Sequence, residues 1–186
     1  MAMTTGTGGP GRHALSEGDR AAGIAQVRAL LRSDSDAEDA LLGRLIDESL
    51  ALAEMFTGQV LIVREMTEAV RGDGGWQRLR ATPVRAVTGV ADAGGVAVPV
   101  ADYAVDIDPA GDGWVRVRGG ARFVVTMRAG MAEDWGALPP GIAGGIVRLA
   151  AHRFAARDED GVPPAAVAAL WRPWRRIRLH DMRVPA

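Results

Sequence analysis

The 186-residue sequence contains no cysteine, no lysine and no asparagine. The absence of cysteine excludes disulfides, thiolate metal sites, iron–sulfur clusters and cysteine nucleophiles. The absence of lysine excludes Schiff-base chemistry and the lysine of a phosphate-binding loop. Arginine supplies all 22 strong bases, so its presence at a given position does not indicate selection over lysine for bidentate binding. Several common enzyme classes are therefore excluded by composition alone.

Long apolar runs and a strong net charge are also missing. No run approaches the 18 or so residues that span a bilayer, and the N-terminus has no signal-peptide core. The formal net charge is −1, which provides no general electrostatic case for binding nucleic acid or an anionic membrane. With 48% hydrophobic and 24% charged residues, the chain has an ordinary globular composition. We expect a soluble, single-domain protein that is not exported and has no membrane contact.

Two amphipathic helices are predicted in the first third of the chain. Apolar residues recur at three- and four-residue spacing over about 19–32 and again over about 36–57. Ser35 and Glu38 have the spacing of a capping box, which places the start of the second helix at Ser35. Gly58 follows that helix, where a left-handed residue commonly ends one. A helical hairpin is expected.

From residue 59 to residue 129 the period changes to that of strands. Six short segments rich in valine and threonine are separated by glycine, proline and aspartate, which predicts about six strands. Trp114, Arg116 and Arg118 alternate with valines, so one face is expected to be solvated and the pairing antiparallel. The glycine-rich stretch 72–75 is interpreted as a hairpin turn at the tip of a projecting region.

Helical pattern returns over residues 139–170. Gly144 and Gly145 weaken a helix relative to alanine, so we expect them to serve a close helix crossing. The order helices, strands, helices predicts an α+β fold, with a helical body and a central antiparallel β-rich region. The predicted organisation is a flexible N-terminal tail (1–18), one α+β domain (19–170) and a basic C-terminal arm (171–186).

Residues able to carry catalysis are few. The three histidines, at 13, 152 and 180, have no acidic partner in a recognisable motif, and the acidic cluster Asp158–Asp160 lacks the spacing of a calcium loop. We therefore predict that the chain is not an enzyme and has no catalytic, cofactor-binding or metal-binding residues.

The C-terminal segment differs from the rest of the chain, because its composition indicates a function. From Trp171 to Ala186 it holds five arginines, two tryptophans and a single aspartate, whereas residues 1–60 hold five arginines against nine acids. Tryptophan and arginine are enriched at interface hot spots, which favours an interaction surface. The alternative is that the tryptophans cap the core while the arginines reach into water. The candidate interface residues are Trp171, Arg172, Trp174, Arg175, Arg176, Ile177, Arg178 and Leu179.

Five blocks spread over residues 36–179 carry a family resemblance. In order they are LIDESLALAEMFTGQVLI, TPVRAVTGVAD, DYAVDIDPAGDGWVRV, RFVVTMRAGMAEDWGALPPGIAGGIVRLAAHRFAARD and ALWRPWRRIRL. Their order and spacing resemble the head–tail connector, or adaptor, proteins of long-tailed phages and of phage-like gene transfer agents. Met127 stands where an aromatic is usual in the family, and the N-terminal 35 residues lie outside the recognised blocks.

The resemblance implies a structural role in a virion or phage-like particle assembled in the bacterial cytoplasm. Such proteins form a ring, usually of twelve copies, beneath the portal protein and provide a docking surface for the stopper and tail. DNA passes through the channel without sequence-specific binding, and no cofactor is used. Because C-terminal segments of these adaptors commonly anchor them on the portal, the resemblance identifies residues 171–179 as a portal-binding arm. The alternative function is a small nucleic-acid-binding module that uses the arginine-rich C-terminus.

Overall fold

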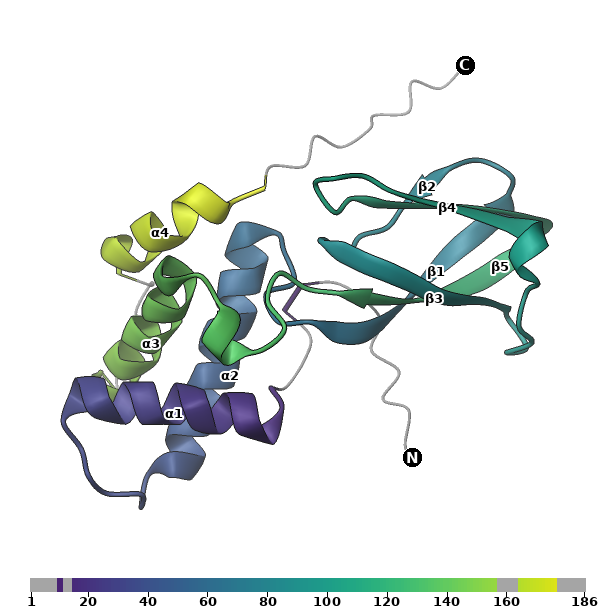
Figure 1. Cartoon of the computed structure of the whole chain (residues 1–186). Helices are drawn as coiled ribbons and strands as arrows, with labels where there is room; N and C mark the ends of the chain where they lie inside the picture. The colour runs from purple at the N-terminus through teal and green to yellow at the C-terminus, as the bar shows by residue number, and fades with distance from the viewer. Residues whose placement is uncertain (1–9, 12–14, 157–163, 177–186) are drawn as a thin grey trace.

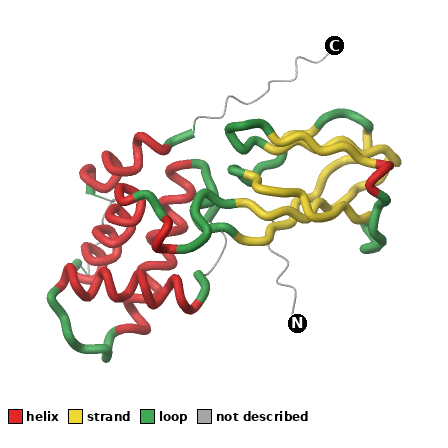
Figure 2. Tube along the Cα trace, in the orientation of Figure 1, coloured by secondary structure: helices red, strands yellow, loops and turns green. Residues whose placement is uncertain are grey.

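The computed structural model describes residues 10–11, 15–156 and 164–176. Helices gather at one end of the molecule and strands at the other, so the chain forms a helical lobe and a β lobe side by side (Figures 1 and 2). The chain enters the β lobe once from the helices and returns once to them. This arrangement confirms the predicted α+β class with a central antiparallel β region.

The helical lobe begins with α1 (Glu17–Leu31) and α2 (Asp39–Thr57). Ser16 caps α1 by accepting a hydrogen bond from the Asp19 backbone N–H at 3.1 Å. The expected capping box at the start of α2 is wrong, because Glu38 occupies the N-cap position and makes no capping hydrogen bond. The Ser35 hydroxyl instead accepts a hydrogen bond from the backbone of Ala37, in a local turn. Gly58 ends α2 with φ of 69°, as predicted.

Two further helices, α3 (Pro140–Ala155) and α4 (Ala165–Trp171), complete this lobe, and a 3-10 turn, Arg172–Trp174, follows α4. The predicted apolar faces of α2 and α3 meet in one core with Trp135 and Trp171, which are both 2% exposed. That core includes Leu42, Ile46, Leu50, Ala53, Ile142, Ile146, Leu149 and Ala150.

The β lobe has five described strands: β1 (Arg64–Asp73), β2 (Gln77–Arg78), β3 (Val84–Asp92), β4 (Tyr103–Ile107) and β5 (Gly113–Ala129). All four shorter strands pair with β5 in antiparallel register. The first half of β5 lies between β2 and β4, and its second half lies between β1 and β3. The long strand therefore belongs to two three-stranded layers.

The bend between the two halves of β5 lies at Gly119 and Gly120, whose φ angles of 147° and 69° suit glycine. This explains why the sequence predicted two strands where the chain forms one. One of the six predicted strand segments, GVAVP at residues 95–99, makes only an isolated bridge, between Ala91 and Ala97. The glycine-rich stretch is also not a hairpin turn, since β1 and β2 each pair with β5.

The β core fills the space enclosed by the two layers. It consists mainly of valine, alanine and methionine, with Phe123 as its one buried aromatic among the described residues. Val115 and Val117 face inward, and Trp114, Arg116 and Arg118 alternate with them, which confirms the predicted solvated face.

A buried ion pair joins the two lobes. Glu54 on α2 accepts hydrogen bonds from both terminal nitrogens of the Arg64 guanidinium on β1, at 2.7 and 2.8 Å. The Glu54 carboxylate also accepts from the backbone N–H groups of Leu61 and Gly11. The two charged side chains are 2% and 10% exposed, respectively, so the pair is shielded from water. Such a pair fixes the direction in which the β lobe leaves α2.

Candidate interaction surfaces

The structure divides the predicted C-terminal interface residues between core and surface. Trp171 is 2% exposed, and its indole N–H donates to the Ile142 carbonyl at 3.3 Å. Its ring lies 5.9 Å from that of Phe56, centroid to centroid. The expectation that Trp171 serves as an anchor for a partner therefore fails, because packing in its own helical lobe already covers the side chain.

The residues after Trp171 lie at the surface where the two lobes meet. Arg172, Trp174 and Arg175 are exposed, with 37% of Trp174 accessible. Arg175 lies over the Phe56 ring at 5.5 Å, a cation–π contact that orients it. The remaining predicted residues Ile177, Arg178 and Leu179 lie outside the described residues.

Arg176 ties the end of this segment to the β lobe. Its backbone N–H donates to the Thr57 carbonyl at 2.8 Å, and its guanidinium contacts the carboxylate of Asp112 at 3.2 Å. The same guanidinium donates to the Ala110 carbonyl, while Gln59 donates to the Trp174 carbonyl at 2.5 Å. Together these bonds hold residues 174–176 against both lobes.

Asp112 is the centre of a polar cluster that holds Arg176. It accepts from Arg78 at 2.5 Å and from the Thr82 hydroxyl at 3.1 Å. Burial by itself raises the pKa of the Asp112 carboxyl. The hydrogen bonds from Arg78 and Thr82 and the positive charges of Arg78 and Arg176 outweigh burial, and they hold the pKa below its ordinary value. The carboxylate is therefore kept charged as an anchor for the C-terminal segment.

The two glycines predicted at a helix crossing have different surroundings. A Cβ on Gly145 would lie 2.2 Å from the indole nitrogen of Trp171, so only glycine lets α3 approach α4 this closely. A Cβ on Gly144 would have one described atom within 4 Å, the tip of Arg148 at 3.6 Å. The structure thus places Gly145, and not Gly144, at the contact between α3 and α4.

A second surface covers the outer face of the β2–β5–β4 layer. Directly paired residues share a face, and here Arg78 lies opposite Trp114. The Arg78 guanidinium lies 5.8 Å from the Trp114 ring, and that of Arg116 lies 5.0 Å from the Trp76 ring. We call this surface the Trp/Arg face, defined by Trp76, Arg78, Trp114, Arg116 and Arg118. Two cation–π pairs side by side fix the planar groups in place.

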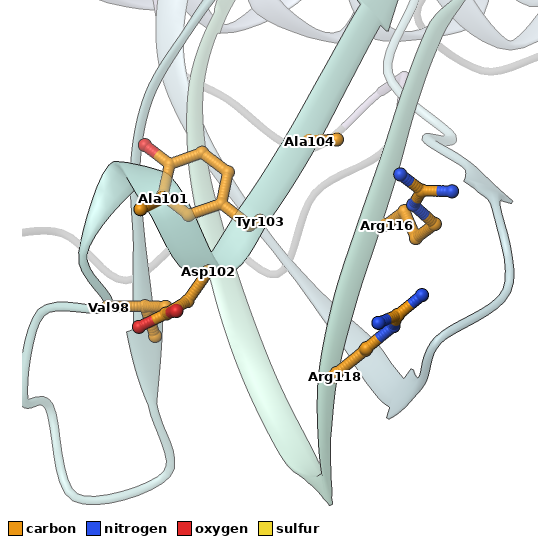
Figure 3. Close-up of a pocket in the computed structure, with 7 residues that line it drawn as sticks. All are labelled: Val98, Ala101, Asp102, Tyr103, Ala104, Arg116 and Arg118. Carbon is orange, nitrogen blue, oxygen red and sulfur yellow. The ribbon is translucent and has the colours of Figure 1, made fainter.

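A hollow of about 420 Å³ adjoins the Trp/Arg face (Figure 3). Arg116 and Arg118 lie on one side of it, and Val98 and Asp102 lie on the other. Ala104, opposite Arg116 on β4, leaves the space open because its side chain is small. Among the described residues, neither arginine has a carboxylate within ion-pair distance. The hollow can thus receive a carboxylate or another anionic group from outside the chain.

The Trp/Arg face was not among the predicted site residues. Its signal is visible in the sequence, since Trp76 and Arg78 have the same two-residue spacing as Trp114, Arg116 and Arg118. The spacing predicted a solvated face, but only the strand register brings the two segments together.

Other chemistry has little support in the part of the chain that the structure describes. No group of three or more histidine, aspartate or glutamate side chains is placed there to hold a metal ion. His152 is exposed on α3, and the Asp158–Asp160 cluster lies outside the described residues. None of the helices described combines the length and apolar character needed to cross a membrane.

Comparison with protein-family models and with curated proteins gave no match. Solved structures do match. A chain in the "neck of empty GTA particle computed with C6 symmetry" is 28% identical, covering 98% of this chain and 100% of the other, with a TM-score of 0.72. A chain in the "neck of native GTA particle computed with C12 symmetry" is 30% identical, covering 87% and 94%, with a TM-score of 0.66. The chain belongs to the family of gene transfer agent neck proteins.

A chain of a third solved structure matches at 29% identity over 97% of this chain and 98% of its own, with a TM-score of 0.69. It comes from the "virion of native gene transfer agent (GTA) particle". Coverage this complete includes both lobes, so the neck-protein family shares the whole two-lobed arrangement. The resemblance read from the sequence is confirmed at the level of gene transfer agent neck proteins.

Proposed function

We propose that the chain is a structural head–tail connector that forms a ring, of twelve copies, beneath the portal of a phage-like particle. The ring links the portal to the stopper or another tail-side component, and DNA passes through its channel without sequence-specific contacts. The protein then acts by assembly and performs no catalysis.

One observation carries this proposal: similarity along nearly the whole chain to proteins of gene transfer agent necks, at 28–30% identity. Those necks were computed with six-fold and twelve-fold symmetry, which supports a ring of identical subunits. A closed ring needs two different contact faces on each subunit. The two-lobed shape provides separate surfaces for such contacts (Figure 1).

We also propose that the portal-binding arm comprises Arg172 and the residues after it, without Trp171. The exposed Trp174 ring and the charged groups of Arg172 and Arg175 can contact acidic and apolar groups of a partner. Arg176 fixes the start of the arm through Asp112. This position at the junction of the lobes supports an arm that leaves the subunit in one defined direction.

Deletion of the chain in a bacterium that produces the particles tests the main proposal. We expect filled heads without tails in electron micrographs, and tailed particles when the full chain is supplied again. Tailed particles in unchanged number without the chain would contradict the proposal.

The arm is tested by truncation after Arg176 combined with Arg172→Ala, Trp174→Ala and Arg175→Ala, which removes the arm's contact groups but leaves Trp171 and the Asp112 cluster intact. The truncated chain should keep its circular dichroism spectrum but lose binding to the purified portal ring. A full-length Arg148→Glu variant is a control, because this exposed arginine on α3 lies outside the arm. Full portal binding by the truncated chain would contradict the arm proposal.

The alternative nucleic-acid-binding function has less support from the described contacts. Arg176 is already engaged by Asp112, and Arg175 is held over Phe56. On the Trp/Arg face, Asp106 lies directly opposite Trp114, so the surface carries both signs of charge. Binding to a phosphate backbone calls for a continuous positive surface.

A further inference from the structure

The Trp/Arg face is an exposed, pre-ordered surface that nothing within the described chain covers. Trp76 is 46% exposed although its ring is fixed against Arg116. Tryptophan and arginine held in place before binding lose little entropy on association, which is typical of interface hot spots. The face therefore has the properties of a docking surface.

Apolar side chains extend this surface at the far end of the β lobe. The loop between β3 and β4 supplies Val98 and Ala101 to the hollow, and its neighbouring residues Val96 and Val100 are 66% and 76% exposed. An apolar rim beside two arginines without carboxylate partners suits a protein segment that combines an acidic group with an apolar one. The exposed Asp102 and Asp106 interrupt the positive charge of this face, so it offers no continuous path for a phosphate backbone. A protein segment with separate acidic groups is therefore favoured over nucleic acid.

A surface of the complementary kind lies at the opposite end of the molecule. The connection between α1 and α2 has acidic residues at positions 34, 36 and 38, and Asp39 begins α2. The neighbouring arginines are Arg28 on α1 and Arg32 at its C-cap. Asp34 and Asp36 are exposed and have no ion-pair partner among the described residues. Leu30, next to this connection, is 51% exposed and provides the apolar group. The connection is at the far end of the helical lobe (Figure 1). The loop between β3 and β4, which lines the hollow, is at the far end of the β lobe.

We propose that the Trp/Arg face and its hollow bind the α1–α2 connection of a second copy of this chain. Arg116 and Arg118 pair with the carboxylates of Asp34 and Asp36, and Val96 and Val100 contact Leu30. Because the two surfaces differ and lie at opposite ends, the contact is heterologous and repeats from one subunit to the next. This inference rests on the proposed ring and identifies the surfaces that would close it.

Cross-linking tests this contact cleanly, because the chain has no cysteine of its own. The double variant Ala37→Cys/Ala101→Cys places one thiol on the acidic connection and one at the rim of the hollow. A short bis-maleimide should then join successive copies into a ladder of covalent multimers. The matched control Ala37→Cys/Ala69→Cys has its second thiol at an exposed position of β1 on the other layer. Single variants and this control should give no product longer than a dimer.

The reaction is carried out on the purified full-length chain and on particles that contain it. Particles that contain the chain but give no ladder overturn the proposed contact while leaving the connector function standing. If the chain is missing from particles, the proposed connector function is wrong. The contact is then tested on the purified chain alone, where a ladder supports it and the absence of a ladder contradicts it. Products whose masses are not multiples of the chain mass overturn the contact between copies and indicate that another protein binds this face. A ladder that is lost on nuclease treatment also overturns it, and indicates that nucleic acid holds the copies together.

Charge reversal provides a second measurement. Arg116→Glu/Arg118→Glu blocks one surface, and Asp34→Arg/Asp36→Arg blocks the other, so each should weaken self-association about tenfold or more. In a mixture of the two variants each copy meets its partner through an intact or a charge-swapped pair of surfaces, so association should return, and native mass spectrometry should detect multimers that alternate between the two variants. Arg122→Glu is the control, since this exposed arginine lies outside both surfaces. Equal weakening by the control would overturn the assignment.

Discussion

The two lobes use tryptophan in opposite ways. Trp135 and Trp171 are buried in the helical lobe, whereas Trp76 and Trp114 lie on the outer face of a β layer and stack with arginines. Trp174 lies between the lobes and is partly exposed. Buried aromatic rings contribute large apolar areas to a core, while exposed rings held by arginine are available to a partner. The comparison indicates that the tryptophans of the helical lobe contribute to its core, whereas those of the β lobe provide surface for the proposed contact between copies.

The largest expected effect comes from removing a buried tryptophan. Trp171→Ala should lower the free energy of unfolding by about 3–5 kcal/mol, because it opens a cavity between α3, α4 and Phe56. Urea denaturation followed by circular dichroism measures the change. Trp174→Ala is the matched control and should cost under about 1 kcal/mol, since its side chain is already partly in water. Equal losses for the two variants would contradict the different roles assigned to them.

Breaking the ion pair between the lobes should have the next largest effect. Glu54→Gln leaves the Arg64 guanidinium without a countercharge in a shielded position, at a cost of about 3 kcal/mol. Denaturation followed separately by near-ultraviolet and far-ultraviolet circular dichroism tests whether the lobes then unfold apart. Glu48→Gln, at an exposed ion pair with Arg153, should cost under about 1 kcal/mol.

Alanine at the two adjacent glycines of α3 sharpens the comparison within the helical lobe. Gly145→Ala should destabilise by about 1–3 kcal/mol, because the new methyl group overlaps the Trp171 ring. Gly144→Ala meets only the end of Arg148 and should stabilise by about 0.5–1 kcal/mol through helix propensity. We expect the thermal midpoint to fall for Gly145→Ala and to rise for Gly144→Ala. A loss at both positions would show that α3 is crowded on both sides.

A smaller, pH-dependent effect is expected at Asp112. Its pKa in the folded chain lies below the ordinary value of 3.8, so its ion pairs stabilise the fold above about pH 4. This contribution is lost as the pH falls through the folded-state pKa. Asp112→Asn should therefore lower stability near neutral pH, by under about 1 kcal/mol, and the difference from wild type should vanish in acid. Asp106→Asn, on the Trp/Arg face, is the control. A loss of stability in Asp112→Asn that does not change with pH would contradict the argument.

The smallest effect on stability is expected on the Trp/Arg face. Trp76→Ala should change the free energy of unfolding by under about 0.5 kcal/mol, since the ring is half in water. The same substitution should weaken the proposed contact between copies, measured by sedimentation of the purified chain. A large loss of stability would show that Trp76 supports the fold, as the buried tryptophans do, and would contradict its assignment to the contact surface.

Local pattern was enough to predict the helices and the antiparallel β region. Apolar spacing placed α2 and α3, and Gly58 marked the end of α2, because these signals depend on neighbours in sequence. Alternation around Trp114 likewise predicted which side chains face water. The start of α2 was misplaced because Ser35 forms a local turn instead of a cap.

Tertiary structure decided what the sequence left open. Trp171 and Trp174 stand three residues apart in a similar context, yet one fills the space left by Gly145 and the other faces water. Likewise, Trp76 and Arg116 meet only because β2 pairs with the first half of β5. Burial and cross-strand contact depend on which distant segment packs alongside, so short-range sequence patterns can propose such residues but cannot assign them.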